Sequence, residues 1–253
     1  MNAFIRLRDE ALTRSVELRR RAALAREPGP EGVHGPARHL LWGEAASIAL
    51  ATRPLAKSPP ALRPQPVVLL PGFGSHTLRM RRLSRALKDA GHRPHDWGQG
   101  FNLGPTEENF AALVARIENL AAREAAPVAL VGWSLGGLFA REAAKVVPQS
   151  VSCVITMGTP FSGDRRANNA WRAYQMITGH RVDEAPIGAN VSEKPPVPTV
   201  ALWSPRDGVV SPRASCGRPG ERDRAVALRC AHMGFALDPE AIAEVLRQLD
   251  WRD

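Results

Sequence analysis

A serine lies between two glycines in the stretch VGWSLGG, at residues 131–137. An apolar run precedes this residue, Ser134, and a helical pattern follows it. A sharp turn from a strand into a helix holds such a serine in strained backbone angles and exposes its hydroxyl, provided that small residues stand two positions away on either side. The N–H groups at the start of the helix then stabilise negative charge beside the hydroxyl. The stretch therefore predicts a nucleophile at Ser134, with a loop of small residues as the alternative.

A serine hydroxyl needs a base, itself oriented by an acid, before it can act as a nucleophile. Where the serine lies on a strand-to-helix turn, the acid and then the histidine follow it along the chain, each after a strand. Asp207 and His232 each come shortly after an apolar segment with strand character. Asp164 also follows such a segment and is the alternative acid. The order and positions therefore predict a triad of Ser134, Asp207 and His232.

Acyl transfer also needs two backbone N–H groups that point at the developing oxyanion. Leu135, the residue after the serine, supplies one of them. The second is expected from the loop after the first strand, in LLPGFGS at 69–75, where Gly72 permits a close turn and Phe73 donates. A role for Phe73 as only a wall of the substrate pocket is the alternative, and it also places this residue near the site.

The chain around these residues alternates between apolar runs and helical patterns. Continuous apolar runs are typical of parallel strands that are covered on both faces. Their alternation with helices indicates an α/β fold, so we expect a mostly parallel sheet with helices on both faces. The expected strands are 66–70, 92–97, 127–133, 151–158, 197–203 and 224–230, and the expected helices are 77–90, 107–125 (capped by Thr106), 135–147 and 238–250.

The stretch 160–196 is too long for a simple connection between two strands, and such stretches tend to be functional. We expect a small lid here, in which Trp171, Tyr174, Met176 and Ile177 present an apolar face to the site. A helix that simply packs on the body is the alternative. The residues predicted to line the substrate pocket are Gly72, Trp133, Phe161, Trp171 and Tyr174.

Residues 1–60 are expected to form a helical extension packed on the α/β domain at 61–253. The first 27 residues have a helical pattern with one apolar stripe and a basic remainder. We expect the stripe to pack on the domain; a weak contact with a membrane surface through residues 1–27 is the alternative. A second helix is expected from about Leu40 to Ala51. The apolar stripe consists of Ile5, Leu12, Val16 and Ala23.

The composition suits one compact domain with a sizeable core, because the 253 residues are 44% hydrophobic and 23% charged. The formal net charge is +9, and all but four of the 34 basic residues are arginines. These arginines are scattered among acidic residues, with no stripe of basic and aromatic side chains. We therefore attribute the charge to an arginine-rich composition and expect no nucleic-acid partner.

The start of the chain carries charges throughout and lacks the apolar segment of a signal peptide. No apolar run approaches the ~18 residues of a membrane span, so we expect a cytoplasmic protein. The cysteines Cys153, Cys216 and Cys230 make no disulfide framework, although a pair between Cys216 and Cys230 remains open. Ligand spacings, phosphate loops and dinucleotide-binding motifs are all lacking from the sequence, so we expect no metal and no cofactor.

Five segments of the chain resemble the α/β-hydrolase superfamily, and its lipase and esterase branch in particular. They lie within residues 66–250 and read LLPGFG, GWSLGG, ITMGTPFSG, WSPRDGVV and AHMGFALDPEAI. The motifs PGFG, GWSLGG and RDGVV also resemble a group of bacterial α/β-hydrolases. The resemblance implies an α/β-hydrolase fold and a serine hydrolase that cleaves a small-molecule or lipid ester through an acyl-enzyme intermediate. Many lipases have His-Gly where this chain has Pro71–Gly72, which removes a supporting hydrogen bond but leaves the backbone donor.

Two other functions remain open at the level of sequence. An acyltransferase, a thioesterase or an amidase would use the same triad, because the choice of acceptor depends on pocket shape and access of water. A protein that binds a membrane surface or a partner through residues 1–27, with the hydrolase-like body as a scaffold, belongs to a different class. The intact set of Ser134, Asp207 and His232 argues against that second function.

Overall fold

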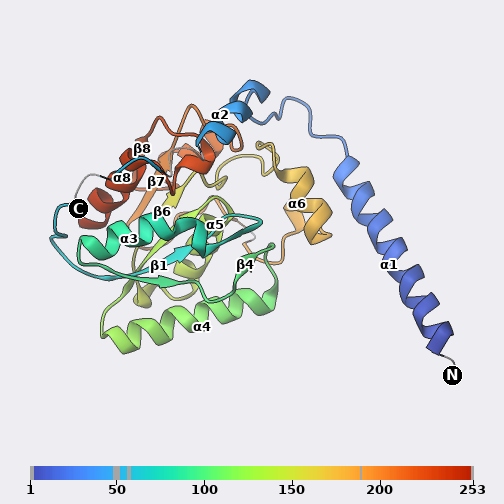
Figure 1. The fold of residues 1–253 in the computed structure, drawn as a ribbon, viewed down its shortest axis with the longest axis horizontal. Coiled ribbons are helices and arrows are strands. Elements are labelled where there is room, and N and C mark those ends of the chain that lie inside the picture. Colours follow the sequence, from blue (N-terminus) through green and yellow to red (C-terminus); the bar gives the residue numbers. More distant parts are fainter. Residues whose placement is uncertain (1–2, 48–51, 56–57, 189, 252–253) are drawn as a thin grey trace.

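The computed structural model of the protein describes residues 3–47, 52–55, 58–188 and 190–251 (Figure 1). Its centre is a parallel sheet of six strands in the order β3-β1-β5-β6-β7-β8. The expected α/β-hydrolase fold with a mostly parallel sheet is thus confirmed. The strands are β1 (Pro66–Leu70), β3 (Arg93–Asp96), β5 (Val128–Trp133), β6 (Val151–Met157), β7 (Thr199–Trp203) and β8 (Arg224–Ala227).

The inner strands β1 and β5 are buried along their whole length, as expected for a parallel sheet that is covered on both faces. The expectation of a buried strand over 224–230 is wrong. Strand β8 ends at Ala227 and is largely open to solvent, because it lies at the edge of the sheet and pairs only with β7.

Helices cover both faces of this sheet. Successive side chains of a strand point to opposite faces. Accordingly, Val67 and Leu69 of β1 pack with α3 (Arg81–Asp89) and α8 (Pro239–Asp250), whereas Val68 and Leu70 pack with α4 and α5. Figure 1 shows α4 on the side of the sheet opposite to α3 and α8. Helix α4 spans Glu107–Glu124, with Thr106 in the expected cap, and α5 spans Leu135–Val146.

The N-terminal segment forms a long helix, α1 (Ala3–Arg26), and a short one, α2 (Leu41–Ser47). Helix α1 projects from the body and runs beside α6 (Trp171–Thr178), whereas α2 lies near the β7–β8 end of the sheet (Figure 1). The two expected helices therefore exist, although residues 48–51 lie outside the described chain.

The expected packing of the apolar stripe of α1 on the body is wrong. Leu12 and Val16 are 54% and 64% exposed, and the side chain of Ile5 lies outside the described residues. Polar groups make the contact instead, because the last carbonyls of a helix lack intrahelical donors. The Arg21 guanidinium donates to the carbonyl of Ile177 in the last turn of α6 at 2.6 Å.

Shorter elements complete the fold. A small antiparallel pair, β2 (Ser75–His76) with β4 (Phe101–Asn102), lies beside the loop after β1. Cys153, Cys216 and Cys230 form no disulfide within the described residues. No helix in the described part of the chain is long and apolar enough to cross a bilayer. The remaining short helices are Arg38–Leu40, Thr77–Met80, Pro148–Ser150, Val182–Glu184, α7 (Pro212–Cys216) and His232–Gly234.

Candidate active site

The turn between β5 and α5 carries Ser134 in a strained conformation, with φ 53° and ψ −122°. A positive φ is uncommon in residues with a side chain and persists only where surrounding bonds hold it. The Ser134 N–H donates to the Met157 carbonyl at 2.8 Å. The Ser134 carbonyl accepts from the Gly137 N–H and from the Thr159 hydroxyl, both at 2.9 Å. The end of β6 and the start of α5 thus fix the strained serine from both sides.

The glycines of the GWSLGG motif are required by close contacts of the backbone. A Cβ atom on Gly132 would lie 2.5 Å from the backbone of Gly136 and Gly137. A Cβ atom on Gly136 would lie 2.2 Å from the Leu70 carbonyl oxygen at the end of β1. A larger residue at either position would push the helix away from the sheet and release the strain on Ser134.

Asp207 and His232 form a buried pair at the same edge of the sheet. Asp207 Oδ2 lies 2.8 Å from His232 Nδ1, and the two side chains are 0% and 4% exposed. The other carboxylate oxygen of Asp207 accepts the N–H groups of Val209 and Val210, each at 2.8 Å. Asp207 lies in the loop after β7 and His232 begins the short helix after β8, so two adjacent parallel strands deliver the pair.

The alternative acid lies elsewhere. Asp164 is exposed, and its carboxylate caps the N–H of Arg166 at 2.7 Å. The Arg166 guanidinium pairs with Asp183 instead of Asp164. The carboxylate that contacts His232 is therefore that of Asp207.

The surroundings of His232 raise the pKa of its imidazole above the usual 6.5. Burial by itself lowers this pKa, but the charge of Asp207, its hydrogen bond and the charge of Glu44 together outweigh burial. Trp133, the residue before the serine, packs its indole 5.8 Å from the imidazole and donates to the His232 carbonyl at 3.1 Å. Within the described chain Ser134 Oγ makes no hydrogen bond to His232, and such bonds often tighten only with substrate bound.

The two N–H groups expected at the oxyanion hole flank the serine. Leu135 begins α5, and Phe73 follows Gly72, where an added Cβ atom would lie 3.3 Å from the Ser134 Cβ. Neither the Phe73 nor the Leu135 N–H has a hydrogen-bond partner within the residues that the structure describes. Both N–H groups are thus without a partner in the described part of the chain, in segments that adjoin Ser134.

Buried Asn102 of β4 fixes the loop that carries Phe73, a role that sequence reasoning missed. Its side-chain amide donates to the Pro71 carbonyl at 2.8 Å, and its backbone carbonyl accepts the Gly74 N–H at 2.7 Å. Asn102 lies in a two-residue strand, so neither a motif nor a periodic pattern marks it.

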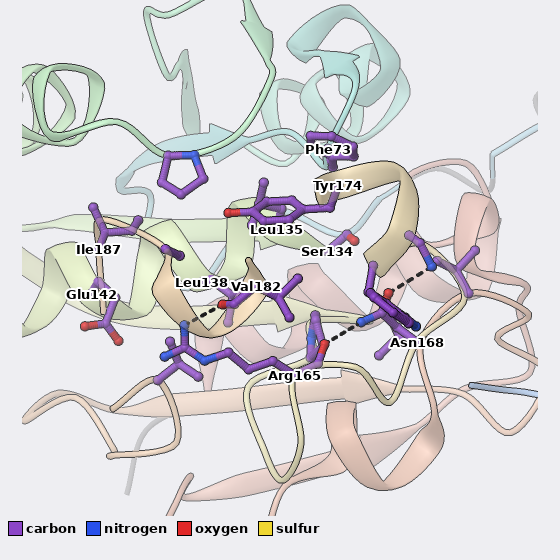
Figure 2. A pocket seen from close by; sticks show the side chains of 18 residues that line it. Phe73, Ser134, Leu135, Leu138, Glu142, Arg165, Asn168, Tyr174, Val182 and Ile187 are labelled. Atoms are coloured by element: carbon purple, nitrogen blue, oxygen red, sulfur yellow. Dashed lines mark hydrogen bonds between the residues drawn. The ribbon is translucent and has the colours of Figure 1, made fainter. Parts of the chain in front are cut away.

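An apolar cavity opens over Ser134, with an empty volume of about 750 Å³ that includes open solvent at its mouth. Figure 2 shows the Ser134 side chain among Phe73, Leu135 and Tyr174 at this cavity. Burial raises the pKa of Tyr174 above its usual range, so its phenol is neutral. The lining residues are Phe73, Pro105, Ser134, Leu135, Leu138, Glu142, Pro160, Arg165, Asn168, Ala170, Trp171, Tyr174, Val182, Ala185, Ile187, Val191, Val209 and Val210.

Three residues expected in the pocket lie outside its lining. Gly72 supports the oxyanion loop, and Trp133 faces His232. Phe161 is fully buried beneath the guanidinium of Arg141, which lies 4.1 Å from the ring centroid. Trp171 and Tyr174 do line the cavity, as expected.

The rest of the predicted apolar face on α6 points away from the cavity. Met176 and Ile177 are 37% and 44% exposed and are absent from the lining. An α-helix has about 3.6 residues per turn, so Tyr174 lies about 60° from Trp171 around the axis, whereas Met176 and Ile177 lie about 140° and 120° from it.

The charged groups at the cavity have partners. Glu142 pairs with Lys145 at 2.8 Å, and the Arg165 guanidinium donates to the carbonyls of Val182 and Gly188 at 3.0 and 2.5 Å. No group of three or more acidic, histidine or cysteine side chains that could hold a metal occurs among the described residues.

Glu44 is a second residue that sequence reasoning missed. This glutamate of α2 is 8% exposed, and its carboxylate accepts the N–H groups of Gly208, His232 and Met233. It looks like an ordinary surface charge in the sequence, because its partners are backbone groups far along the chain.

Comparison with known proteins shows the family of this chain. The model of the alpha/beta hydrolase family matches residues 67–251. No curated protein matches the sequence.

Solved structures share the fold at low sequence identity. BpoC from Mycobacterium tuberculosis H37Rv, named for non-heme bromoperoxidase activity, is similar with a TM-score of 0.55 and 20% identity over 78% of this chain and 95% of that one. The monoacylglycerol lipase of Paleococcus ferrophilus has a TM-score of 0.53 and 18% identity over 78% and 97%. Naproxen esterase from Bacillus subtilis has a TM-score of 0.50 and 14% identity over 83% and 96%.

Proposed function

Because the chain belongs to the alpha/beta hydrolase family, we propose that it is a serine hydrolase that cleaves carboxylic esters through Ser134, His232 and Asp207. The observation that carries this proposal is the strained Ser134 at an apolar cavity. It follows a strand of the same parallel sheet whose later strands are followed by the buried Asp207–His232 pair. The lipase and the esterase among the structural neighbours support an ester as the substrate.

In the proposed reaction Ser134 Oγ attacks the acyl carbon while His232 accepts the hydroxyl proton. The carbonyl oxygen becomes an oxyanion, which the N–H groups of Leu135 and Phe73 stabilise. The tetrahedral intermediate collapses, His232 returns the proton to the leaving alcohol, and an acyl-enzyme remains. Water then attacks this ester by the same route and releases the acid. Asp207 holds the imidazole in the correct tautomer and stabilises its positive charge.

The apolar lining favours a substrate with an apolar acyl group, since burial of apolar surface drives its binding. The stretch 160–196 supplies Trp171, Tyr174 and Val182 to that lining, and we assign it the role of a small lid. An acyltransferase, a thioesterase or an amidase would use the same residues, so the acceptor and the leaving group have to be determined by experiment.

The test is a panel of p-nitrophenyl esters of increasing acyl length, with one thioester and one anilide, assayed on the protein and on Ser134→Ala. We expect ester hydrolysis by the protein and its loss in the variant. A fluorophosphonate probe, which phosphonylates an activated serine, should label only the protein with Ser134. Labelling without hydrolysis of any ester would keep the nucleophile but reject the ester as the substrate; labelling of the alanine variant would reject both.

A further inference from the structure

Glu44 lies outside the region that matches the family, yet it contacts both loops that carry the proposed acid and base. One carboxylate oxygen, Oε1, accepts the N–H of Gly208, the residue after Asp207, at 2.8 Å. The same oxygen accepts the N–H of His232 at 2.8 Å, and Oε2 accepts that of Met233 at 2.7 Å. One side chain thus ties together two loops that follow different strands.

The site is built to receive this carboxylate. The Ser47 hydroxyl donates to the Glu44 carbonyl at 2.7 Å and holds the end of α2. A Cβ atom on Gly208 would lie 2.8 Å from the Leu40 backbone and 3.0 Å from Glu44 Oε1, so the close approach of α2 requires a glycine there. Bonds from N–H groups to an ionised carboxylate are among the strong hydrogen bonds of proteins.

We propose that Glu44 is a positioning residue for the triad, which holds the Asp207 loop and the His232 loop at the spacing that their 2.8 Å contact needs. This proposal rests on the proposed function, because it assumes that His232 is the base. It also gives the N-terminal segment a role in the reaction, because α2 contacts the loops of the acid and the base from outside the substrate cavity, whose lining does not include Glu44.

The charge of Glu44 provides a measurable consequence. Asp207 and Glu44 are the charged groups that raise the pKa of the His232 imidazole, against the effect of burial. Loss of the Glu44 charge therefore lowers this pKa. Because the base must be neutral to accept the serine proton, the acidic limb of the pH profile of kcat/KM follows the pKa of His232 in the free enzyme.

The test compares Glu44→Gln with Glu31→Gln, an exposed glutamate of the same N-terminal segment. Glutamine keeps the shape and one acceptor oxygen, but its NH₂ group meets the Met233 N–H as a second donor. We expect kcat to fall about tenfold or more with KM within about twofold. We also expect the midpoint of the acidic limb of the kcat/KM profile to shift to lower pH by about half a unit or more. Glu31→Gln should match the unchanged protein in kcat, in KM and in the position of the acidic limb.

Glu44→Asp serves as the second variant, because it keeps the charge but shortens the side chain by one methylene. It should lower kcat while leaving the acidic limb closer to that of the unchanged protein. The rate of fluorophosphonate labelling should fall in parallel with kcat for both variants. A folded Gln or Asp variant with the kcat of Glu31→Gln, even with a lower Tm, would overturn the proposal. Absence of labelling in the unchanged protein would instead overturn the proposed function.

Discussion

The turn that carries Ser134 and the stretch 160–196 beside it are held by different forces. The turn connects β5 to α5 at the end of a sheet whose two faces are covered by large apolar clusters. Hydrogen bonds from the end of β6 and the start of α5 fix its backbone. Among its described residues the stretch contributes a small buried apolar cluster, formed by Trp171, Tyr174 and Val182. Side chains also donate to its carbonyls: Arg21 of α1 donates to Ile177, and Arg165 within the stretch donates to Val182. The edge of the sheet is thus fixed by buried packing and backbone hydrogen bonds. The conformation of the adjoining stretch depends more on hydrogen bonds from individual side chains.

Replacement at the rigid edge should have the largest effect. Ser134→Ala removes the nucleophile but no packing, since Ser134 is only half-buried. We expect turnover of the best ester to fall by about four orders of magnitude or more, with an unchanged Tm. An alanine variant that keeps more than about a hundredth of the activity would place the nucleophile elsewhere.

The second prediction separates the two candidate acids. Asp207→Asn should lower kcat by about a hundredfold or more, because the imidazole loses the acceptor that orients it. Asp164→Asn, at the start of the stretch 160–196, should change kcat by less than about tenfold, since Asp164 caps only a local turn. Steady-state kinetics on one ester would check both, and the reverse order of effects would reject Asp207 as the acid.

The third prediction concerns the attachment of the stretch 160–196 to the body. Buried Arg141 of α5 donates to the carbonyls of Val191, Ser192, Glu193 and Glu221, and burial lowers its pKa to about 10. Its loss leaves these carbonyls without the guanidinium as donor. We therefore expect Arg141→Met to lower the free energy of unfolding by about 3 kcal/mol in urea titrations.

The exposed Arg123 on α4 provides the control for that measurement. Arg123→Met should change the free energy of unfolding by less than about 0.5 kcal/mol, because surface changes away from special contacts are usually small. Equal effects of Arg123→Met and Arg141→Met would show that the buried guanidinium does not hold the stretch.

The fourth prediction is a pH dependence. The pKa of His232 is raised above 6.5, so kcat/KM should decline as pH falls through a midpoint above 6.5. The contribution of the Asp207–His232 pair to stability has the opposite sign: it is complete below pH 6.5 and is lost as pH rises through the folded-state pKa. A midpoint at or below 6.5 in a pH-rate profile would contradict the raised pKa.

The smallest effect is expected on the exposed face of α1. Leu12 and Val16 of α1 are mostly exposed, so the double change to serine should alter Tm by about one degree or less. The same variant tests the contact with a membrane surface that the sequence suggests for residues 1–27. Weaker binding to vesicles with anionic lipid would support that contact, and unchanged binding would exclude these two side chains from it.

The sequence by itself determined the architecture of the body and the places where chemistry can occur. Local signals suffice there: continuous apolar runs predict buried parallel strands, and the spacing of glycines around Ser134 predicts a sharp turn from a strand into a helix. Asp207 and His232 were predicted from their order and their positions after strands, because the carboxyl ends of parallel strands meet at one edge of the sheet.

Only the tertiary structure decided how the flanking segments meet this edge. Glu44 bonds to backbone N–H groups 164 to 189 positions away, and backbone groups are the same in every sequence. The exposed stripe of α1 has a similar cause: an amphipathic pattern predicts a helix with an apolar face but does not say which surface covers that face. Such contacts depend on the packing of whole elements, which residue types and local spacing do not encode.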